Sequence, residues 1–368
     1  MRAFCEGLDL VEAVLKVVKA ASNKTVNPIL EGIKITAEDD TLTLVATDSE
    51  LAIEKKIKAD VKVEGETVVP GKFFSEFVKK LANEQIELDL NEKNQLKIKY
   101  TDSEVYIQCL PSIEYPSIQK IDNAQFFTIA QNNFKDLINQ TIFSVALDDS
   151  RPILKGCLLE IDENTVTSVA LDGFRLAKAT YPILEQTARV SVIVPGRSLN
   201  EISKLLDDTE ENIRVFIQRN YLMVQVDNTK IITRLIDGDF INYKQIISSD
   251  FSTIITVNKS QLEDSLDRAS ILSRVSNDNI VRLTIKDNML TMSASSEIGN
   301  VTEKINIVLS GNELSICFDS RFLKDCIRVC KDEFIKLMFT TSFNPCIIKA
   351  NEGDNYLFLI LPLKQLTN

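Results

Sequence analysis

Carboxylates, lysines and thiols are the groups in this sequence that could carry out chemistry, because none of its 368 residues is a histidine. The lack of imidazole excludes Ser-His-Asp and Cys-His catalytic arrangements, and it excludes histidine-ligated zinc. The sequence also lacks a Gly-x-x-x-x-Gly-Lys-Ser/Thr loop, so the chain alone is not expected to hydrolyse a nucleotide. Carboxylate or lysine chemistry is the catalytic class that survives these exclusions.

Asp48 and Asp172 are two carboxylates that a sequence pattern relates to each other. Asp172 lies in residues 169–177, which alternate apolar and polar residues around an Asp-Gly turn, as a β-hairpin does. Residues 45–52 hold a first copy with Asp48, residues 293–297 hold a weaker third copy, and successive copies are 124 residues apart. Such a long period indicates repeated domains. A catalytic pair would have to lie about 5–10 Å apart, whereas these two aspartates occupy equivalent positions in separate domains. We therefore interpret both as turn residues.

The seven cysteines do not form the pattern of a metal or disulfide site. They are odd in number and include no Cys-x-x-Cys pair. Cys326 and Cys330 would share one face of a helix, but there is no histidine to complete a metal site with them. We therefore predict buried free thiols in a reducing compartment, with no metal and no other cofactor.

The repeat predicts three domains, at residues 1–122, 126–248 and 252–368. Each is expected to pack two amphipathic helices on antiparallel sheet, which is an α+β architecture. In the first helix, Leu8, Val11, Leu15 and Val18 are expected to form the buried stripe. The helices are expected over residues 9–22, 72–83, 132–147, 197–206, 259–274 and 320–330.

The sequence shows no signal for a membrane or for export. No apolar run approaches the roughly eighteen residues that a membrane-spanning helix needs. The N-terminus reaches Glu6 without the apolar stretch of a signal peptide. A hydrophobic content of 44% is enough for sizeable cores, so we expect a folded cytoplasmic protein.

The net charge of −11 argues against a nucleic-acid partner, but the charge is unevenly distributed. The predicted helices with their flanking residues hold 16 basic and 13 acidic side chains, which leaves −14 on the rest of the chain. These helices either have ordinary solvated faces or together line a surface that binds phosphates without sequence readout. A closed ring of six helices packed about 10 Å apart would have a hole roughly 19 Å across, and a ring of twelve would have a hole roughly 38 Å across. Only two chains paired head to tail would therefore surround a DNA duplex.

Four motifs together resemble the bacterial β sliding clamp family, the processivity subunits of DNA polymerase III. They lie at residues 28–32, 170–177, 194–197 and 359–363, and the resemblance covers the whole chain. It implies a non-catalytic homodimer in which each chain forms half of a ring around double-stranded DNA, without sequence specificity. It also implies short-peptide binding to the DNA polymerase III catalytic subunit, the clamp loader, and other polymerases and repair proteins, in the cytoplasm at the nucleoid.

The resemblance implies three sets of site residues. The DNA contacts would be Lys24, Lys72, Arg151 and Arg197. Across the dimer interface, Val105 and Ile107 would meet Ile271 and Leu272. A peptide pocket between the second and third domains would be lined by Leu154, Leu171, Gly173, Phe174, Arg175, Leu176, Ile241, Ile246, Leu359, Ile360, Leu361, Pro362 and Leu363.

The chain departs from the family pattern in this pocket. Many members have threonine, histidine and proline where this chain has Leu171, Phe174 and Ile241, so a more apolar pocket is expected. Arg175 is expected to form an exposed positive rim, and Phe174→Ala to weaken peptide binding more than Arg175→Ala does. The tail extends beyond Leu363 by residues 364–368. A protein-only scaffold and a carboxylate-based enzyme remain as alternatives, and retention on circular DNA would distinguish them from a clamp.

Overall fold

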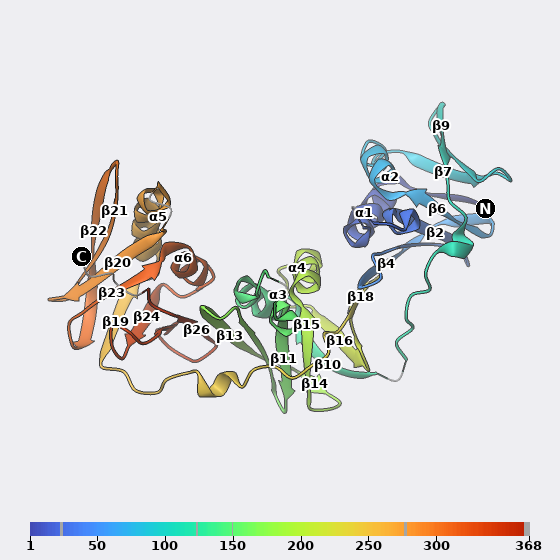
Figure 1. Ribbon diagram of the computed structural model, residues 1–368. Helices are drawn as coiled ribbons and strands as arrows, with labels where there is room; N and C mark the ends of the chain where they lie inside the picture. The colour runs from blue at the N-terminus through green and yellow to red at the C-terminus, as the bar shows by residue number, and fades with distance from the viewer. Residues whose placement is uncertain (23–24, 123, 149, 276–277, 364–368) are drawn as a thin grey trace. The chain divides into compact units, whose positions relative to one another are not determined.

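The computed structural model describes residues 1–22, 25–122, 124–148, 150–275 and 278–363, so Lys24 and the tail at 364–368 lie outside the described residues. The chain divides into two units, and each is described by itself (Figure 1). The first unit comprises Met1–Gln131, Leu184–Thr187 and Lys204–Leu235. The second comprises Asn132–Ile183, Ala188–Ser203 and Ile236–Asn368.

Each sequence repeat contributes two α-helices to the described residues, as the sequence predicted. They are α1 (Gly7–Val17), α2 (Gly71–Val78), α3 (Gln131–Asn139), α4 (Gly196–Leu205), α5 (Lys259–Val275) and α6 (Ser320–Arg328). Short 3-10 helices are η1 (Val18–Ala20), η2 (Pro28–Glu31), η3 (Ser112–Glu114), η4 (Ile142–Ser144), η5 (Pro152–Lys155) and η6 (Tyr243–Gln245). Within the part of the chain that the structure describes, no helix has both the length and the apolar character needed to span a membrane.

The first unit contains two antiparallel sheets. The five-stranded sheet has the order β5 (Asp60–Val63), β1 (Arg2–Glu6), β7 (Gln85–Leu90), β8 (Gln95–Tyr100) and β9 (Ser103–Gln108). The nine-stranded sheet has the order β14 (Glu185–Gln186), β10 (Gln125–Ala130), β16 (Asn212–Gln218), β17 (Tyr221–Val226), β18 (Thr229–Arg234), β4 (Leu51–Lys58), β3 (Thr41–Thr47), β2 (Gly32–Glu38) and β6 (Gly65–Pro70).

The second unit contains one long antiparallel sheet of twelve strands. Its order is β15 (Val190–Pro195), β11 (Gly156–Asp162), β12 (Thr165–Leu171), β13 (Arg175–Pro182), β26 (Tyr356–Ile360), β25 (Cys346–Ala350), β24 (Phe334–Phe339), β19 (Thr253–Asn258), β22 (Gly299–Gly311), β21 (Met289–Ser296), β20 (Ile280–Lys286) and β23 (Leu314–Asp319).

The sheets continue across the joints between successive repeats. At the first joint, β18 of the second repeat pairs with β4 of the first, with Ile231 opposite Ile53. At the second joint, β26 of the third repeat pairs with β13 of the second, with Phe358 opposite Ala177. The strand that begins after each repeated turn therefore also forms the joint with the next repeat.

The buried face of α1 differs from the sequence prediction. Leu8, which was expected in the buried stripe, is 65% exposed, and the fully buried residues of α1 include Leu10, Val14 and Val17. Both sets of positions step by three and four residues, so the helical period alone could not select between them. Packing of α1 against β4 and α2 makes the selection.

Three helices end at least five residues earlier than predicted, and one of them is α1, which ends at Val17. The expected helix at 132–147 ends as α3 at Asn139 and gives way to η4. Thr141 Oγ1 donates to the carbonyl oxygens of Leu137 at 2.9 Å and Ile138 at 3.3 Å, which satisfies groups at the C-terminal end of α3. The expected helix at 72–83 ends as α2 at Val78, and Phe73 on this helix is 51% exposed.

The seven cysteines are free and buried, as predicted. Burial raises the pKa of the Cys5, Cys157 and Cys330 thiols to about 12. These thiols therefore stay protonated at neutral pH and are poor nucleophiles.

Candidate functional site

The tight turn between β12 and β13 forms the centre of the site. Asp172 Oδ1 accepts hydrogen bonds from the backbone N–H groups of Phe174 at 2.9 Å and Arg175 at 3.0 Å. Gly173 has a φ of +94°, in the left-handed region that glycine adopts without steric cost. A Cβ atom at Gly173 would meet nothing within 4 Å, so the backbone conformation, and not crowding, favours glycine here.

The first repeat builds the same turn around Asp48. Its Oδ1 accepts hydrogen bonds from the backbone N–H groups of Glu50 at 3.0 Å and Leu51 at 2.8 Å. Ser49 takes the position of the glycine, with a φ of +79°. Asp48 and Asp172 therefore each stabilise their own turn, which confirms their interpretation as turn residues.

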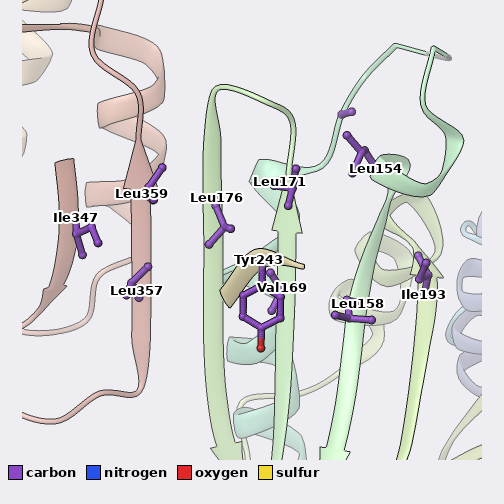
Figure 2. Packing of buried hydrophobic residues seen from close by; sticks show 11 residues of the cluster. Leu154, Leu158, Val169, Leu171, Leu176, Ile193, Tyr243, Ile347, Leu357 and Leu359 are labelled. Carbon is purple, nitrogen blue, oxygen red and sulfur yellow. The ribbon is translucent and has the colours of Figure 1, made fainter. Parts of the chain in front are cut away.

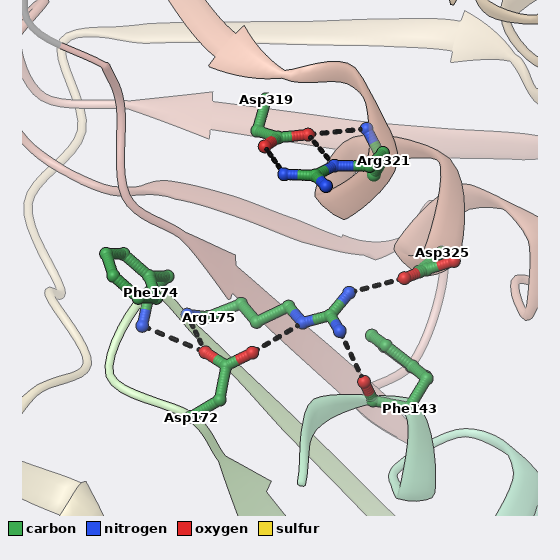
Figure 3. A network of polar contacts seen from close by, with 7 residues as sticks. All are labelled: Phe143, Asp172, Phe174, Arg175, Asp319, Arg321 and Asp325. Atoms are coloured by element: carbon green, nitrogen blue, oxygen red, sulfur yellow. Dashed lines mark hydrogen bonds and ion pairs between the residues drawn. The ribbon is translucent and has the colours of Figure 1, made fainter. Parts of the chain in front are cut away.

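Arg175 is largely buried, so the expectation of an exposed positive rim is wrong. Its side chain is 10% exposed, and it donates from Nε to Asp172 Oδ2 at 2.9 Å and from Nη1 to Asp325 Oδ2 at 2.5 Å. Nη2 donates to the carbonyl oxygen of Phe143 at 2.6 Å (Figure 3). These bonds join the hairpin to η4 of its own repeat and to α6 of the third repeat.

Two aromatic rings complete the surroundings of Arg175. The guanidinium carbon lies 4.6 Å from the ring centroid of Phe322 and 5.4 Å from that of Phe143. Phe322 also stacks on Phe174, with ring centroids 6.0 Å apart. Sequence reasoning missed Phe143, Phe322 and Asp325, because no local pattern relates them to the hairpin.

Five of the predicted apolar pocket residues belong to or pack against a hydrophobic core beneath the hairpin (Figure 2). Buried members of this core from the predicted set are Leu154, Leu171, Leu176 and Leu359, and Ile241 packs against it partly buried. Ile360 is completely buried, so its side chain is not available to a ligand. Phe174, Ile246 and Leu361 are the predicted apolar residues with the most exposed surface.

A hollow of about 300 Å³ opens beside the turn. Its lining combines apolar, acidic and basic groups, so it fits a small apolar side chain with a polar neighbour. Arg151, which was predicted to contact DNA, lines this hollow. The lining residues are Ala146, Asp148, Ser150, Arg151, Leu154, Asp172, Gly173 and Phe174.

The segment that follows β26 is hydrogen-bonded to the hairpin tip. The backbone N–H of Leu361 donates to the carbonyl oxygen of Phe174 at 2.9 Å. The backbone N–H of Leu363 donates to the carbonyl oxygen of Cys317 at 2.8 Å. Leu361, Pro362 and Leu363 remain partly or largely exposed. The structure thus brings together the turn and the C-terminal segment that the sequence predicted as parts of one site.

Known proteins match this sequence over nearly the whole chain. Models of the N-terminal, central and C-terminal domains of the DNA polymerase III beta subunit match residues 1–119, 128–242 and 244–364. The beta sliding clamp of Bacillus subtilis strain 168 is 34% identical over 368 residues, which cover 96% of this chain and 97% of that protein. The chain belongs to the DNA polymerase III beta subunit family.

Solved structures agree with this assignment. The crystal structure of the DNA polymerase sliding clamp from Bacillus subtilis matches with a TM-score of 0.96 and 32% identity, and it covers 99% of each chain. A putative DNA polymerase III beta subunit from Eubacterium rectale matches with a TM-score of 0.95 and 31% identity, covering 99% of this chain and all of that one. The α+β fold with three clamp domains is thereby confirmed, and the family is a non-catalytic processivity factor.

The basic residues that the family resemblance suggested for DNA lie at related positions. Lys72 and Arg197 are both exposed and are the second residues of α2 and α4. The second residue of α6 is Arg321, which is also exposed and which sequence reasoning missed. The start of the second helix in each repeat was the signal that could have identified Arg321.

The residues predicted for the dimer interface differ in their exposure. Ile271 on α5 is 61% exposed, Leu272 is partly buried, and Val105 on β9 is partly buried. Ile107 is 5% exposed, so its side chain already packs inside its own sheet and has little surface left for a partner. Ile107 alternates with the exposed Tyr106, as the strand period of two requires.

Proposed function

We propose that the chain is a DNA sliding clamp, in which two copies form a ring around duplex DNA and tether DNA polymerase to its template. The match of three successive family domains along the chain carries this proposal. The domain limits that we propose are 1–122, 126–248 and 252–368. The clamp acts on DNA in the cytoplasm, at the nucleoid.

The strand order supports a third joint, made between two chains. Strand β9 follows β8 in the first repeat as β18 follows β17 in the second, and β18 is a strand that forms a joint. Within the described residues, β9 pairs with β8 alone and lies at the edge of its sheet. A strand edge of this kind is available for pairing with another chain.

The matching free edge lies on the first half of β22. By the offset of 124 residues, Gly299 takes the place of Arg175 and of Leu51 in the other repeats. Strand β22 pairs with β21 along residues 299–306, but its pairing with β19 begins only at Ile307. Residues 299–306 therefore have one unpaired edge among the described residues, and we propose that β9 of the partner subunit occupies it.

The register of this joint follows from the other two. Thr233 lies opposite Leu51 at the first joint, and Ile360 lies opposite Arg175 at the second. Transferred to β9, this register places Ile107 opposite the partner subunit's Gly299 and Glu104 opposite the partner subunit's Thr302. Two such joints relate the chains head to tail and close a ring.

The helices beside the proposed joint have exposed apolar residues. Phe143 and Phe322 enclose Arg175 at the second joint. Ile271 on α5 lies as many residues after β19 as Phe143 lies after β10, and Phe73 on α2 lies as many residues after β6 as Phe322 lies after β23. Ile271 and Phe73 are therefore the equivalents of Phe143 and Phe322. We propose that Ile271, with Leu272 beside it, packs against the partner subunit's Phe73.

Retention on DNA is proposed to be topological, with weak phosphate contacts from the helices. Lys72, Arg197 and Arg321 begin equivalent helices, where the positive end of the helix dipole also favours an anion. Lys24 and Arg151 are further proposed contacts. Such contacts weaken steeply with salt and carry no sequence information, which suits a protein that slides.

Short peptides of partner proteins are proposed to bind beside the hairpin. The hollow of about 300 Å³ would take an apolar anchor, and the exposed Phe174, Ile246 and Leu361 would extend it. The proposed partners are the DNA polymerase III catalytic subunit, the clamp loader, and other polymerases and repair proteins. The apolar side chains of Leu171, Phe174 and Ile241 favour aliphatic and aromatic anchors.

Loading on circular DNA tests the proposed function. Protein loaded by a clamp loader onto a nicked circle should stay bound in high salt, because a closed ring does not depend on phosphate contacts. It should leave when the circle is cut once, because it slides off the end. Gel filtration of labelled protein with the DNA, before and after cutting, measures both results.

Equal loss from circular and linear DNA would contradict the ring. Failure to stay on circles even when the loader is supplied would favour the protein-only scaffold. Loading of two circles of unrelated sequence to the same extent serves as the control for sequence-independent binding.

Disulfide trapping tests the register of the proposed joint. Glu104→Cys and Thr302→Cys in one chain should cross-link two subunits under mild oxidation, because both positions are exposed on strand edges. The seven native cysteines are buried, so they should not compete. Each single variant is the control, and a covalent dimer that forms as readily from Glu104→Cys with Asn306→Cys would contradict this register.

A further inference from the structure

Asp325 lies outside the hollow beside the turn, but it is bonded to Arg175, whose side chain supports that turn. It is on α6 in the third repeat, it is 43% exposed, and its Oδ2 lies 2.5 Å from Arg175 Nη1. Asp325 is not among the residues that line the hollow. It therefore cannot be assigned to the site by contact with a ligand there.

The bond is one of several that hold α6 against the second repeat. Lys331 Nζ, just beyond α6, donates to Asp136 on α3 at 2.5 Å. At the other end of the helix, Phe322 stacks on Phe174. In the sequence, Asp325 lies between these two contacts. Its partner Arg175 is the largely buried member of the pair and belongs to the hairpin, so the bond from Asp325 holds the hairpin end of α6 in place.

A displacement of Arg175 would move both the turn and the C-terminal segment, which are the two walls of the site. Arg175 directly follows the turn, and its backbone N–H is held by Asp172 at 3.0 Å. The neighbouring carbonyl of Phe174 holds the N–H of Leu361 at 2.9 Å. The turn and the C-terminal segment therefore share one support, to which Asp325 contributes a charged hydrogen bond.

We propose that Asp325 is a positioning residue for peptide binding, which holds Arg175 and α6 so that the turn and the C-terminal segment are pre-arranged for a partner peptide. This inference rests on the proposed function. A site that is formed only part of the time binds with an affinity reduced by that fraction. Loss of the bond should therefore weaken binding without removing any contact to the peptide.

Direct use of Arg175 by the peptide is the competing explanation, and it makes the opposite prediction. Asp325 would then compete with the peptide for the guanidinium, and its removal would strengthen binding. The geometry favours positioning, because Nε, Nη1 and Nη2 of Arg175 already donate to Asp172, Asp325 and Phe143. Two rings flank the same guanidinium, which leaves it little access.

Titration of a fluorescent peptide into the full-length dimer tests the proposal. The probe is the C-terminal peptide of the DNA polymerase III catalytic subunit. Asp325→Asn should weaken binding about three- to tenfold, since a half-exposed ion pair contributes less than a buried one. Asp325→Glu should restore binding to within about twofold, because it keeps the carboxylate in a half-exposed place.

Asp267→Asn is the matched control. Asp267 is also half exposed and also pairs with a residue of α6, because Lys324 Nζ lies 2.6 Å from its Oδ1. That pair lies within the third repeat and does not involve the hairpin, so binding should stay within about twofold of wild type. Amide hydrogen exchange at Leu361 should speed up in Asp325→Asn and not in Asp267→Asn.

The possible outcomes separate the inference from the proposed function. If the wild-type dimer does not bind the peptide, the proposed peptide site fails. If wild type binds and Asp325→Asn binds equally or more tightly, positioning by Asp325 is overturned. An equal loss in Asp267→Asn, or no recovery in Asp325→Glu, would overturn it as well, because the effect would then be general.

Discussion

Arg175→Ala is expected to lower the free energy of unfolding of the second unit by about 3 kcal/mol, as loss of one partner from a buried ion pair does. The side chain is 10% exposed and donates to Asp172, Asp325 and the carbonyl of Phe143. Its removal leaves the largely buried carboxylate of Asp172 without this donor, which costs more than the bond itself contributes. Peptide binding should fall with it, because the turn loses its support.

Phe174→Ala should have the smaller effect, which reverses the order expected from the sequence. The Phe174 ring is 60% exposed, and its stacking on Phe322 contributes about 1 kcal/mol. Urea unfolding and peptide titration of both variants measure the difference. Arg175→Lys, which keeps the charge but not the planar fork, should recover only part of the loss. A larger loss for Phe174→Ala would show that the exposed ring, and not the buried network, determines binding.

The double variant Ile271→Ala, Leu272→Ala is expected to dissociate the dimer at nanomolar concentration. Ile271 is 61% exposed in the single chain, and Leu272 beside it is partly buried. If both are buried in the dimer, each truncation costs about 2 kcal/mol or more. A total near 4 kcal/mol raises the dissociation constant roughly a thousandfold. Analytical ultracentrifugation with fluorescence detection measures it.

Phe343→Ala is the control for that experiment. Phe343 is 80% exposed in the turn between β24 and β25 of the same repeat, whereas α5 packs mainly against β21, β22 and α6. The Phe343→Ala substitution removes exposed apolar surface without changing the proposed interface, so the dimer should persist. A double variant that remains dimeric at nanomolar concentration would contradict the placement of the interface at Ile271 and Leu272.

The features that the sequence predicted are those determined by local chemistry. The Asp-Gly turn was predictable because Asp172 bonds its own neighbours and Gly173 tolerates a left-handed backbone. The repeat of 124 residues predicted the corresponding turn at Asp48, and hence the order of the domains. The two helices of each repeat followed from apolar spacing, which is also local.

The features that were missed depend on contacts between distant parts of the chain. The buried face of α1 could not be chosen, because two stripes have the same spacing and only packing on β4 selects one. Arg175 was taken for a surface charge because arginine is rarely buried, and its partner Asp325 lies 150 residues away. The burial of the Ile107 side chain in its own sheet also depends on packing between strands, so the sequence alone did not show it.

The joints β4–β18 and β13–β26 are formed within one chain, whereas the joint proposed for β9 is formed between two. After a break, the intrachain joints re-form at the millimolar effective concentration that a short linker maintains. The two joints between chains have no linker, so a dimer in which both have broken must re-form at the bulk concentration of the protein. The ring is therefore expected to open at one of the two joints between chains and not at a joint within a chain, and these two joints act as its gates for DNA.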